Sequence, residues 1–302
     1  MRQQEIMQRL QQEMPGTCIL QKEPMKKHTS FKIGGPADLF FIPRNKEEIT
    51  LAIGLCKEYD FPFYIMGNGS NLLVSDEGYP GMIIQIYKNM SQVKIEGEKV
   101  WAEAGILLST LSKKIVDEGL AGFEFASGIP GTLGGALYMN AGAYDGEMKL
   151  IVDSVEVLDD KGKCMTLRNE EMKFGYRTSI LHHSPYIAIG ASLQLAKGDK
   201  TCILGKVEDF TERRKTKQPL EYPSAGSAFK RPEGFYAGKL IMDTGLRGYR
   251  IGGAQVSEKH CGFIINVGDA TAKDVKALIS FVQEQVFEKF GVQLEPEVRM
   301  LG

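Results

Sequence analysis

The chain has 302 residues, 43% of them apolar, which is enough for a buried core, and its length predicts about two domains or three small ones. Its 37 basic and 38 acidic residues leave a net charge of −1 at pH 7. Such a balance gives no broad attraction for nucleic acid or an anionic membrane, so we expect neither as a partner.

The cysteines and histidines argue against a disulfide framework and a metal site. The five cysteines are odd in number and widely spaced, with no C-x-x-C pair, which is typical of reduced thiols in a cytoplasmic protein. None of the four histidines has ligand spacing to another histidine or cysteine, so we expect no metal. The polar start MRQQEIMQRLQQEMPG predicts a short amphipathic helix, not a signal peptide.

The first part of the chain predicts a small α+β unit that ends near Tyr87. Asn45 and Glu48 have the spacing of a helix cap and precede a helix that continues to about Tyr59. Apolar stretches at 39–42, 63–66 and 82–86 predict the strands around it. A second helix, with Leu107, Leu111 and Ile115 on one face, should stop at Gly119.

The remainder predicts a mixed sheet and then a separate C-terminal core. Strands are expected at 151–158, 164–167 and 186–195, followed by a helix at 201–217 that ends in a basic cluster. A capping box at Thr271 and Asp274 opens a helix that should end at Gly291. We therefore predict three domains, at 1–87, 88–217 and 218–302.

A glycine-rich run from Gly122 to Glu147 is the most informative segment. The residues from Phe125 to Tyr144 carry no charge, but five glycines and Pro130 interrupt them too often for a membrane helix. Glycine lets another surface reach the backbone, so the run suits contact with a flat, partly charged ligand. A tightly packed turn between core strands is the alternative.

A second glycine-rich loop, Gly67 to Asn71, follows an apolar, β-prone stretch. Successive backbone N–H groups in such a bend can converge on phosphate oxygens. Neither loop matches the G-x-G-x-x-G or G-x-x-x-x-G-K-[ST] pattern. A dinucleotide would therefore bind here in a manner unlike that of the Rossmann fold.

Three segments place a reactive residue among apolar or small neighbours: Arg177 among aromatic residues, Ser227 among small ones, and Glu297 with Arg299 two positions on, which in a strand would share a face. Taken singly, each is also compatible with a surface ion pair, a turn serine or a charged strand edge. Ser227 lies in no G-x-S-x-G elbow, so no hydrolase triad is indicated.

Together these motifs resemble one family, in the same order over nearly the whole chain. The glycine run, GNGSN at 67–71, YRTS at 176–179, AGSAFK at 225–230, EPEVR at 295–299 and HTSFKIGG at 28–35 are similar to those of the UDP-N-acetylenolpyruvoylglucosamine reductases. The resemblance implies an α+β fold: a two-subdomain FAD-binding fold of the vanillyl-alcohol-oxidase type plus a C-terminal α/β substrate-binding domain. It also implies noncovalent FAD, so that His28 is structural, and NADPH as the reductant.

By this resemblance, the reaction is the reduction of the enolpyruvyl group of a UDP-N-acetylglucosamine enolpyruvate to UDP-N-acetylmuramate, in cytoplasmic peptidoglycan precursor synthesis. Arg177 would stabilise the enolate that develops on the substrate, Glu297 would assist at the same centre, and Ser227 would protonate C2. The implied cofactor-binding residues are Gly67, Asn68, Gly69, Ser70, Asn71, Gly128, Ile129, Pro130, Gly131, Gly134, Gly135, Asn140, Ala141, Gly142, Ala143 and Arg214.

The substrate diphosphate needs cations, for which Lys217, Lys230 and Arg299 are the candidates. The nearby alternatives are Arg231, Arg247 and Arg250. Only 49 residues separate Arg177 from Ser227. This spacing is similar to the shorter branch of the family, which lacks a substrate-covering tyrosine loop. We expect a monomer.

Two other functions fit the same residues. An FAD-dependent oxidase or dehydrogenase of a hydroxy acid or sugar would be reduced by its substrate instead of NADPH. A flavin- or nucleotide-binding protein without turnover would consume no NADPH. A yellow colour, bleaching by NADPH, and NADPH consumption that depends on the enolpyruvyl sugar nucleotide separate the three.

Overall fold

The computed structural model describes residues 2–302, which fold into two compact units. Unit 1 contains residues up to 21, 39–68 and 81–212, and unit 2 contains 22–38, 69–80 and 213–302. Two N-terminal segments thus fold with the last third of the chain, because Phe31, Ile33 and Leu73 are buried in the core of that third. The functional division into domains at 1–87, 88–217 and 218–302 stays a prediction.

The first sheet has the strand order β1-β2-β5-β3. Its strands are β1 (Cys18–Pro24), β2 (Pro36–Ile42), β3 (Phe63–Met66) and β5 (Tyr79–Gln85), and β3 pairs parallel with β5. Helices α1 (Arg2–Glu13) and α2 (Lys46–Glu58) pack with it around one core that includes Ile6, Leu10 and Ile49. This confirms the predicted amphipathic first helix and the three predicted strands.

The start of α2 follows the predicted cap. Asn45 Oδ1 accepts a hydrogen bond of 2.9 Å from the Glu48 N–H. The Glu48 carboxylate is fully buried, where it accepts from the Arg44 N–H at 2.8 Å and pairs with the Arg44 guanidinium. The cap therefore includes an ion pair in which Glu48 is buried and Arg44 is half-exposed, so loss of the guanidinium would leave an uncompensated buried charge.

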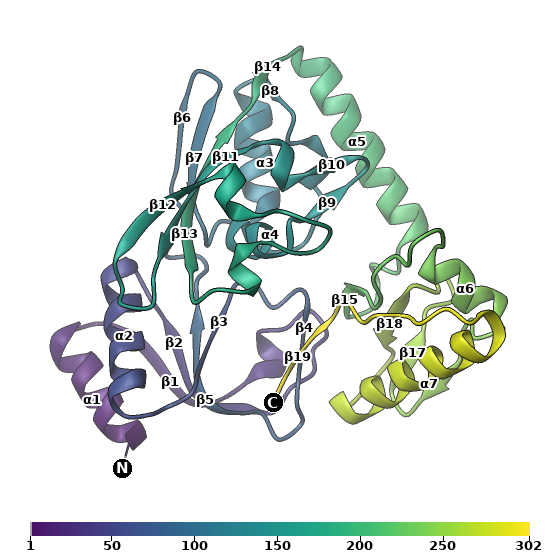
Figure 1. Ribbon diagram of the computed structural model, residues 1–302, viewed down its shortest axis with the longest axis horizontal. Helices are drawn as coiled ribbons and strands as arrows, with labels where there is room; N and C mark the ends of the chain where they lie inside the picture. Colours follow the sequence, from purple (N-terminus) through teal and green to yellow (C-terminus); the bar gives the residue numbers. More distant parts are fainter. Residues whose placement is uncertain (1) are drawn as a thin grey trace. The chain divides into compact units, whose positions relative to one another are not determined.

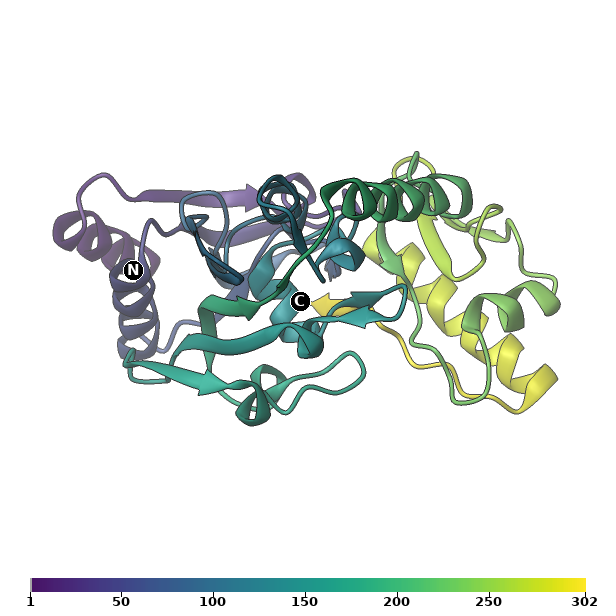
Figure 2. The same cartoon turned by 90° about the horizontal axis from the view of Figure 1, so that it is seen from above.

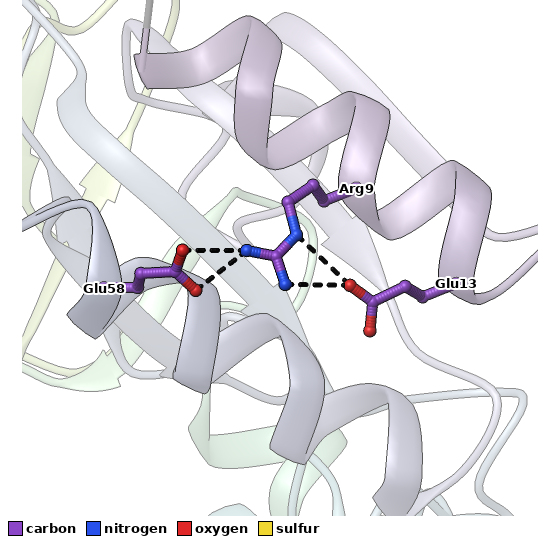
Figure 3. A network of polar contacts seen from close by, with 3 residues as sticks. All are labelled: Arg9, Glu13 and Glu58. Carbon is purple, nitrogen blue, oxygen red and sulfur yellow. Dashed lines mark hydrogen bonds and ion pairs between the residues drawn. The ribbon is translucent and has the colours of Figure 1, made fainter.

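An exposed network joins α1 to α2 (Figure 3). Arg9 Nη1 donates to both Glu58 oxygens at 2.8 and 2.9 Å, and Arg9 Nη2 donates to Glu13 Oε1 at 3.0 Å. Because these side chains are solvent-exposed, the network contributes little to stability. The buried apolar faces of the two helices hold them together instead.

The second sheet of unit 1 is antiparallel, with the order β12-β11-β13-β7-β6 (Figure 1). Its strands are β6 (Val93–Glu96), β7 (Lys99–Glu103), β11 (Val152–Leu158), β12 (Cys164–Arg168) and β13 (Ile187–Gln194). Helices α3 (Leu108–Asp117) and α4 (Leu133–Met139) contribute to its core. The three strands predicted in this region are confirmed, whereas α4 lies inside the glycine run, where no helix was expected.

Short elements complete unit 1: β8 (Leu120–Ala121), β9 (Gly142–Ala143), β10 (Gly146–Glu147), β14 (Ala196–Lys197), and 3-10 turns η2 (Glu124–Ala126), η3 (Met148–Leu150), η4 (Asn169–Met172) and η5 (Ile180–His182). Helix α5 (Lys200–Lys217) confirms the helix predicted before the last third. The division between the units falls within α5, after Glu212.

Unit 2 is built on the antiparallel sheet β15-β18-β17-β16, with α7 (Ala272–Phe290) packed on it (Figure 2). Its other elements are β15 (Ser224–Ser227), β16 (Arg250–Ile251), β17 (Ala254–Val256), β18 (Phe263–Asn266), α6 (Ala237–Asp243), η1 (Met25–Lys27), and the parallel pair β4 (Leu72–Val74) and β19 (Arg299–Leu301). The capping box at Thr271 and Asp274 and the stop at Gly291 are confirmed.

No helix within residues 2–302 combines the length and apolar character that crossing a membrane requires.

Candidate functional site

The two glycine-rich segments meet in unit 1. Gly67 follows β3 and lies so close to Thr132 that a Cβ atom on it would be 2.3 Å from Thr132 Oγ1. Gln85 Nε2 donates to the Gly67 carbonyl at 3.1 Å and holds this backbone in place. The absence of a side chain at Gly67 therefore has a geometric cause, which is close approach to the start of α4.

The first N–H groups of helix α4 donate hydrogen bonds to other groups of the protein. Thr132 is the N-cap, and its Oγ1 accepts from the Gly135 N–H at 3.4 Å. The Leu133 and Gly134 N–H groups donate to the carbonyls of Ile106 and Ala104 at 2.8 and 2.7 Å. Because the first turn bonds within the protein, the run is a rigid, packed element and not an open phosphate loop. The cofactor-binding role of Gly134 and Gly135 stays a prediction.

The end of the glycine run is a tight hairpin. Strands β9 and β10 pair across Tyr144 and Asp145, whose φ angles are 51° and 64°. The Tyr144 ring stacks on Phe210 of α5 with centroids 4.2 Å apart, and its hydroxyl donates to the Phe210 carbonyl at 3.2 Å. This packing holds the backbone of Gly142 and Ala143 in one conformation.

Arg177 lies on a tight turn of unit 1. Gly175 and Thr178 exchange backbone hydrogen bonds of 3.0 and 3.3 Å, which leaves Tyr176 and Arg177 at the tip. Arg177 has φ +54°, a left-handed conformation that is unfavourable for a residue with a Cβ atom. Its guanidinium carbon lies 5.2 Å from the centre of the Tyr176 ring.

The turn is bonded to the end of α4. Asn140 is the left-handed C-cap of α4 and is 1% exposed. Its Nδ2 donates to the Gly175 carbonyl at 3.0 Å, and Ser179 Oγ donates to the Tyr138 carbonyl at 2.9 Å. The glycine run and the arginine turn, separate in sequence, thus form one structure.

In unit 2, Ser227 lies at a β-bulge. The pairing of β15 with β18 shifts register between Ser224 and Ser227, so two residues of β15 oppose one of β18. Gly226 lies at the bulge with φ +78°, which glycine adopts without steric cost. Bulges re-aim the side chains beside them, and here that side chain is the half-buried Ser227.

Glu297 is brought to Ser227 by the backbone. The Glu297 N–H donates to the Ala228 carbonyl at 2.9 Å, and the Lys230 N–H donates to the Glu295 carbonyl at 2.8 Å. The strand expected to include Glu297 begins only at Arg299, because the chain pairs first with 228–230 and then changes partner to β4. The argument that a strand puts Glu297 and Arg299 on one face was therefore wrong.

Asn71 of the GNGSN loop joins this arrangement. Its Nδ2 donates to the Glu297 carbonyl at 3.1 Å, and its own carbonyl accepts from the Arg299 N–H at 3.0 Å. Unit 2 thus collects one end of the predicted cofactor loop, the serine and the glutamate, while Arg177 belongs to unit 1.

The basic candidates differ in their surroundings. Lys230 forms an ion pair with Glu295, Lys217 is exposed at the end of α5, and Arg214 is 7% exposed on the same helix. The three alternative arginines each contact another group of the protein. The Arg231 guanidinium carbon lies 4.1 Å from the centre of the Tyr236 ring. Arg247 and Arg250 donate to the Glu258 and Gly252 carbonyls at 2.8 and 2.6 Å.

The comparisons with known proteins cover most of the chain. Residues 37–168 match the FAD binding domain family, and residues 218–301 match the C-terminal domain of UDP-N-acetylenolpyruvoylglucosamine reductase. The reductase of that name from Alkaliphilus oremlandii is 58% identical over 96% of this chain and 95% of its own. The one from Clostridioides difficile is 53% identical over 93% of this chain and 92% of its own.

The chain belongs to the UDP-N-acetylenolpyruvoylglucosamine reductase family. The crystal structure of the Thermus caldophilus reductase agrees, with a TM-score of 0.81 and 37% identity over 95% of this chain and 99% of that one. The predicted fold class and the prediction of an FAD-dependent oxidoreductase are confirmed.

The residues present fit an FAD group. The matched FAD-binding domain contains both glycine-rich segments, and among the described residues Ser127 Oγ, in the glycine run, is buried without a hydrogen-bond partner, which fits a bound polar ligand. Sequence reasoning missed Thr132, although a threonine three residues before Gly135 is a signal for an N-cap.

Proposed function

We propose that this protein reduces the enolpyruvyl group of UDP-N-acetylglucosamine enolpyruvate to UDP-N-acetylmuramate, with FAD and NADPH, in the cytoplasm as a monomer. The observation that carries the proposal is the match to reductases of this name over 91–97% of their length at 51–58% identity. FAD, held by the two glycine-rich segments, would supply the hydride-transfer chemistry between NADPH and C3 of the enolpyruvyl group.

The chain's own residues supply the polar chemistry. Arg177 would face the substrate carboxylate and stabilise the enolate that forms there, since fixed positive charge is most effective where negative charge grows. Its support by the end of α4 means that little reorganisation is needed at the moment of reaction.

Ser227 would donate the proton to C2, and Glu297 would act on the same carboxylate-bearing centre. A serine hydroxyl is a weak acid, so this role needs a strongly basic acceptor and accurate placement. The pairing of Ala228 with Glu297, together with the bulge beside Ser227, supports such placement within unit 2.

We assign the FAD contacts to the two glycine-rich segments and to Arg214, and the diphosphate contacts to Lys217, Lys230 and Arg299. Lys230 would exchange its ion pair with Glu295 for the diphosphate. A surface ion pair contributes little to stability, so this exchange would cost the protein little.

The test separates the two half-reactions by stopped-flow absorbance of the purified flavoprotein. We expect NADPH alone to bleach the flavin, and the enolpyruvyl sugar nucleotide to restore its colour. Ser227→Ala should keep the first rate and lose the second by about 10²–10⁴-fold, the usual contribution of a positioned proton donor. A Ser227→Ala enzyme that is reoxidised at the wild-type rate would remove the proton-donor role. Bleaching by a hydroxy acid instead of NADPH would support an oxidase.

A further inference from the structure

The turn that carries Arg177 is held at both ends by one short stretch of the glycine run. At its start, the Gly175 carbonyl accepts from Asn140 Nδ2 at 3.0 Å. Just after its end, Ser179 Oγ donates to the Tyr138 carbonyl at 2.9 Å. All of these groups belong to unit 1.

The Asn140 amide has a single workable orientation. Nδ2 faces two acceptors, the Gly175 carbonyl and Glu147 Oε2 at 3.1 Å, while Oδ1 accepts from the Lys149 N–H at 2.9 Å. An amide has two donor hydrogens on one side and an acceptor on the other, so both ends are satisfied. The residue is 1% exposed, and a buried, satisfied amide rigidifies what it joins.

Asn140 and the arginine of the turn are both in the left-handed backbone conformation. Arg177 has φ +54° and Asn140 has φ +43°. Such conformations persist where the surrounding structure determines them, and they gather at functional sites. Without the bond to Gly175, the turn would lose a side-chain contact that fixes its position.

We propose that Asn140 is a positioning residue for Arg177: its side-chain amide holds the Gly175 carbonyl and thereby sets where the guanidinium stands. The inference rests on the proposed function of Arg177. Its consequence is that the glycine-rich segment and the charge-stabilising arginine move as one rigid piece.

The main variant is Asn140→Gly, which removes the amide and suits the left-handed backbone. We expect the rate of flavin reoxidation by the enolpyruvyl substrate to fall about 10²-fold, as for a misplacement of about 1 Å. Because Asn140 is also among the implied cofactor-binding residues, the FAD content of the variant is measured first, and the reoxidation rate is expressed per bound flavin. Ser179→Ala, which removes the second contact, should act in the same direction. Wild-type reoxidation rates in both variants would overturn the proposal.

A double-mutant cycle tests whether Asn140 acts through Arg177. If it does, Asn140→Gly should slow reoxidation in the wild-type background but have no further effect in an Arg177→Gln enzyme. A loss of the same size in both backgrounds would overturn the proposal, because a merely structural defect is independent of the arginine.

Hydrogen exchange of the holoenzyme provides a readout apart from activity. Asn140→Gly should speed exchange at the Thr178 amide, which bonds to the Gly175 carbonyl. Unchanged exchange would overturn the proposal. The control is Asn45→Gly, which removes the amide that accepts from the Glu48 N–H in the same unit and should leave reoxidation and the Thr178 amide unchanged.

These experiments distinguish an incorrect proposed function from an incorrect positioning role of Asn140. If the wild-type flavin is not reoxidised by the sugar nucleotide, the proposed function is wrong, while exchange at Thr178 still tests the contact. If reoxidation occurs and Asn140→Gly affects neither rate nor exchange, only the positioning role is wrong.

Discussion

Replacing Gly67 with alanine tests the close contact between the two glycine-rich segments. The new Cβ would lie 2.3 Å from Thr132 Oγ1, well inside van der Waals distance. Thr132 is 2% exposed, so its side chain has no free space into which to turn. Relief would require a change of rotamer and loss of the bond from the Gly135 N–H.

Two contributions determine how much free energy of unfolding the Gly67→Ala variant loses. Overpacking of a buried site costs about 1–3 kcal/mol. Loss of a threonine N-cap costs about 1 kcal/mol. We therefore expect Gly67→Ala to lower the free energy of unfolding of unit 1 by about 2–4 kcal/mol.

The assay is urea unfolding followed by the fluorescence of the single tryptophan, Trp101, which lies in β7 of the same unit. The control is Gly54→Ala on α2, where an added Cβ meets nothing within 4 Å. That variant should be about 1 kcal/mol more stable, because alanine favours a helix over glycine.

A second substitution decides the cause. Thr132→Ala removes the clashing oxygen, so Gly67→Ala should cost almost nothing when added to it. If the losses of the two single variants simply add in the double variant, the contact between Gly67 and Thr132 is not the reason for the glycine.

Three further outcomes follow from the structure. Arg44→Ala should destabilise the protein by about 3–5 kcal/mol, because it leaves the fully buried Glu48 carboxylate without its cationic partner, and urea midpoints would measure this; a loss below 1 kcal/mol, the value of a surface pair, contradicts it. Hydrogen bonds from the backbone, led by the Thr271 N–H, lower the pKa of Asp274. The ionised carboxylate therefore stabilises the folded protein at pH values above the unfolded-state pKa, and this stabilisation is lost as pH falls through the folded-state pKa. The stability gap between wild type and Asp274→Asn, about 1 kcal/mol at pH 7, should therefore shrink at pH 3, and a constant gap would be inconsistent with this. Burial raises the pKa of the Cys56 thiol to about 12. In native protein at pH 8, a thiol reagent should therefore react with the exposed cysteines and reach the buried ones only in urea. Fast labelling of Cys56 in the native protein would contradict its burial. The exposed cysteines are Cys18, Cys164 and Cys202, and the buried ones are Cys56 and Cys261.

Much of the local structure could be predicted from the sequence, because caps and stops act between neighbours. The Asn45 cap, the capping box at Thr271 and the end of α7 at Gly291 each depend on one or a few hydrogen bonds within a turn of helix. The residue types for the chemistry, an arginine, a serine and a glutamate, were also visible in the sequence motifs.

Tertiary packing decided the glycine run. Gly134 and Gly135 weaken a helix, so propensity predicted none there. The helix α4 exists because Leu133 and Leu137 are fully buried and the N–H groups of its first turn find partners outside it. Pattern alone does not reveal such partners.

Long-range pairing decided the site. The backbones of Ala228 and Glu297 are hydrogen-bonded although they lie far apart in the chain. Asn71, from the N-terminal part of the chain, donates to the Glu297 carbonyl. The segments 22–38 and 69–80 fold with the last third for the same reason, since Phe31 and Leu73 find their apolar neighbours there. A sequence specifies which residues are apolar or reactive, but the neighbours that bury and aim them are chosen by the packing of the whole chain, and packing has no local signature.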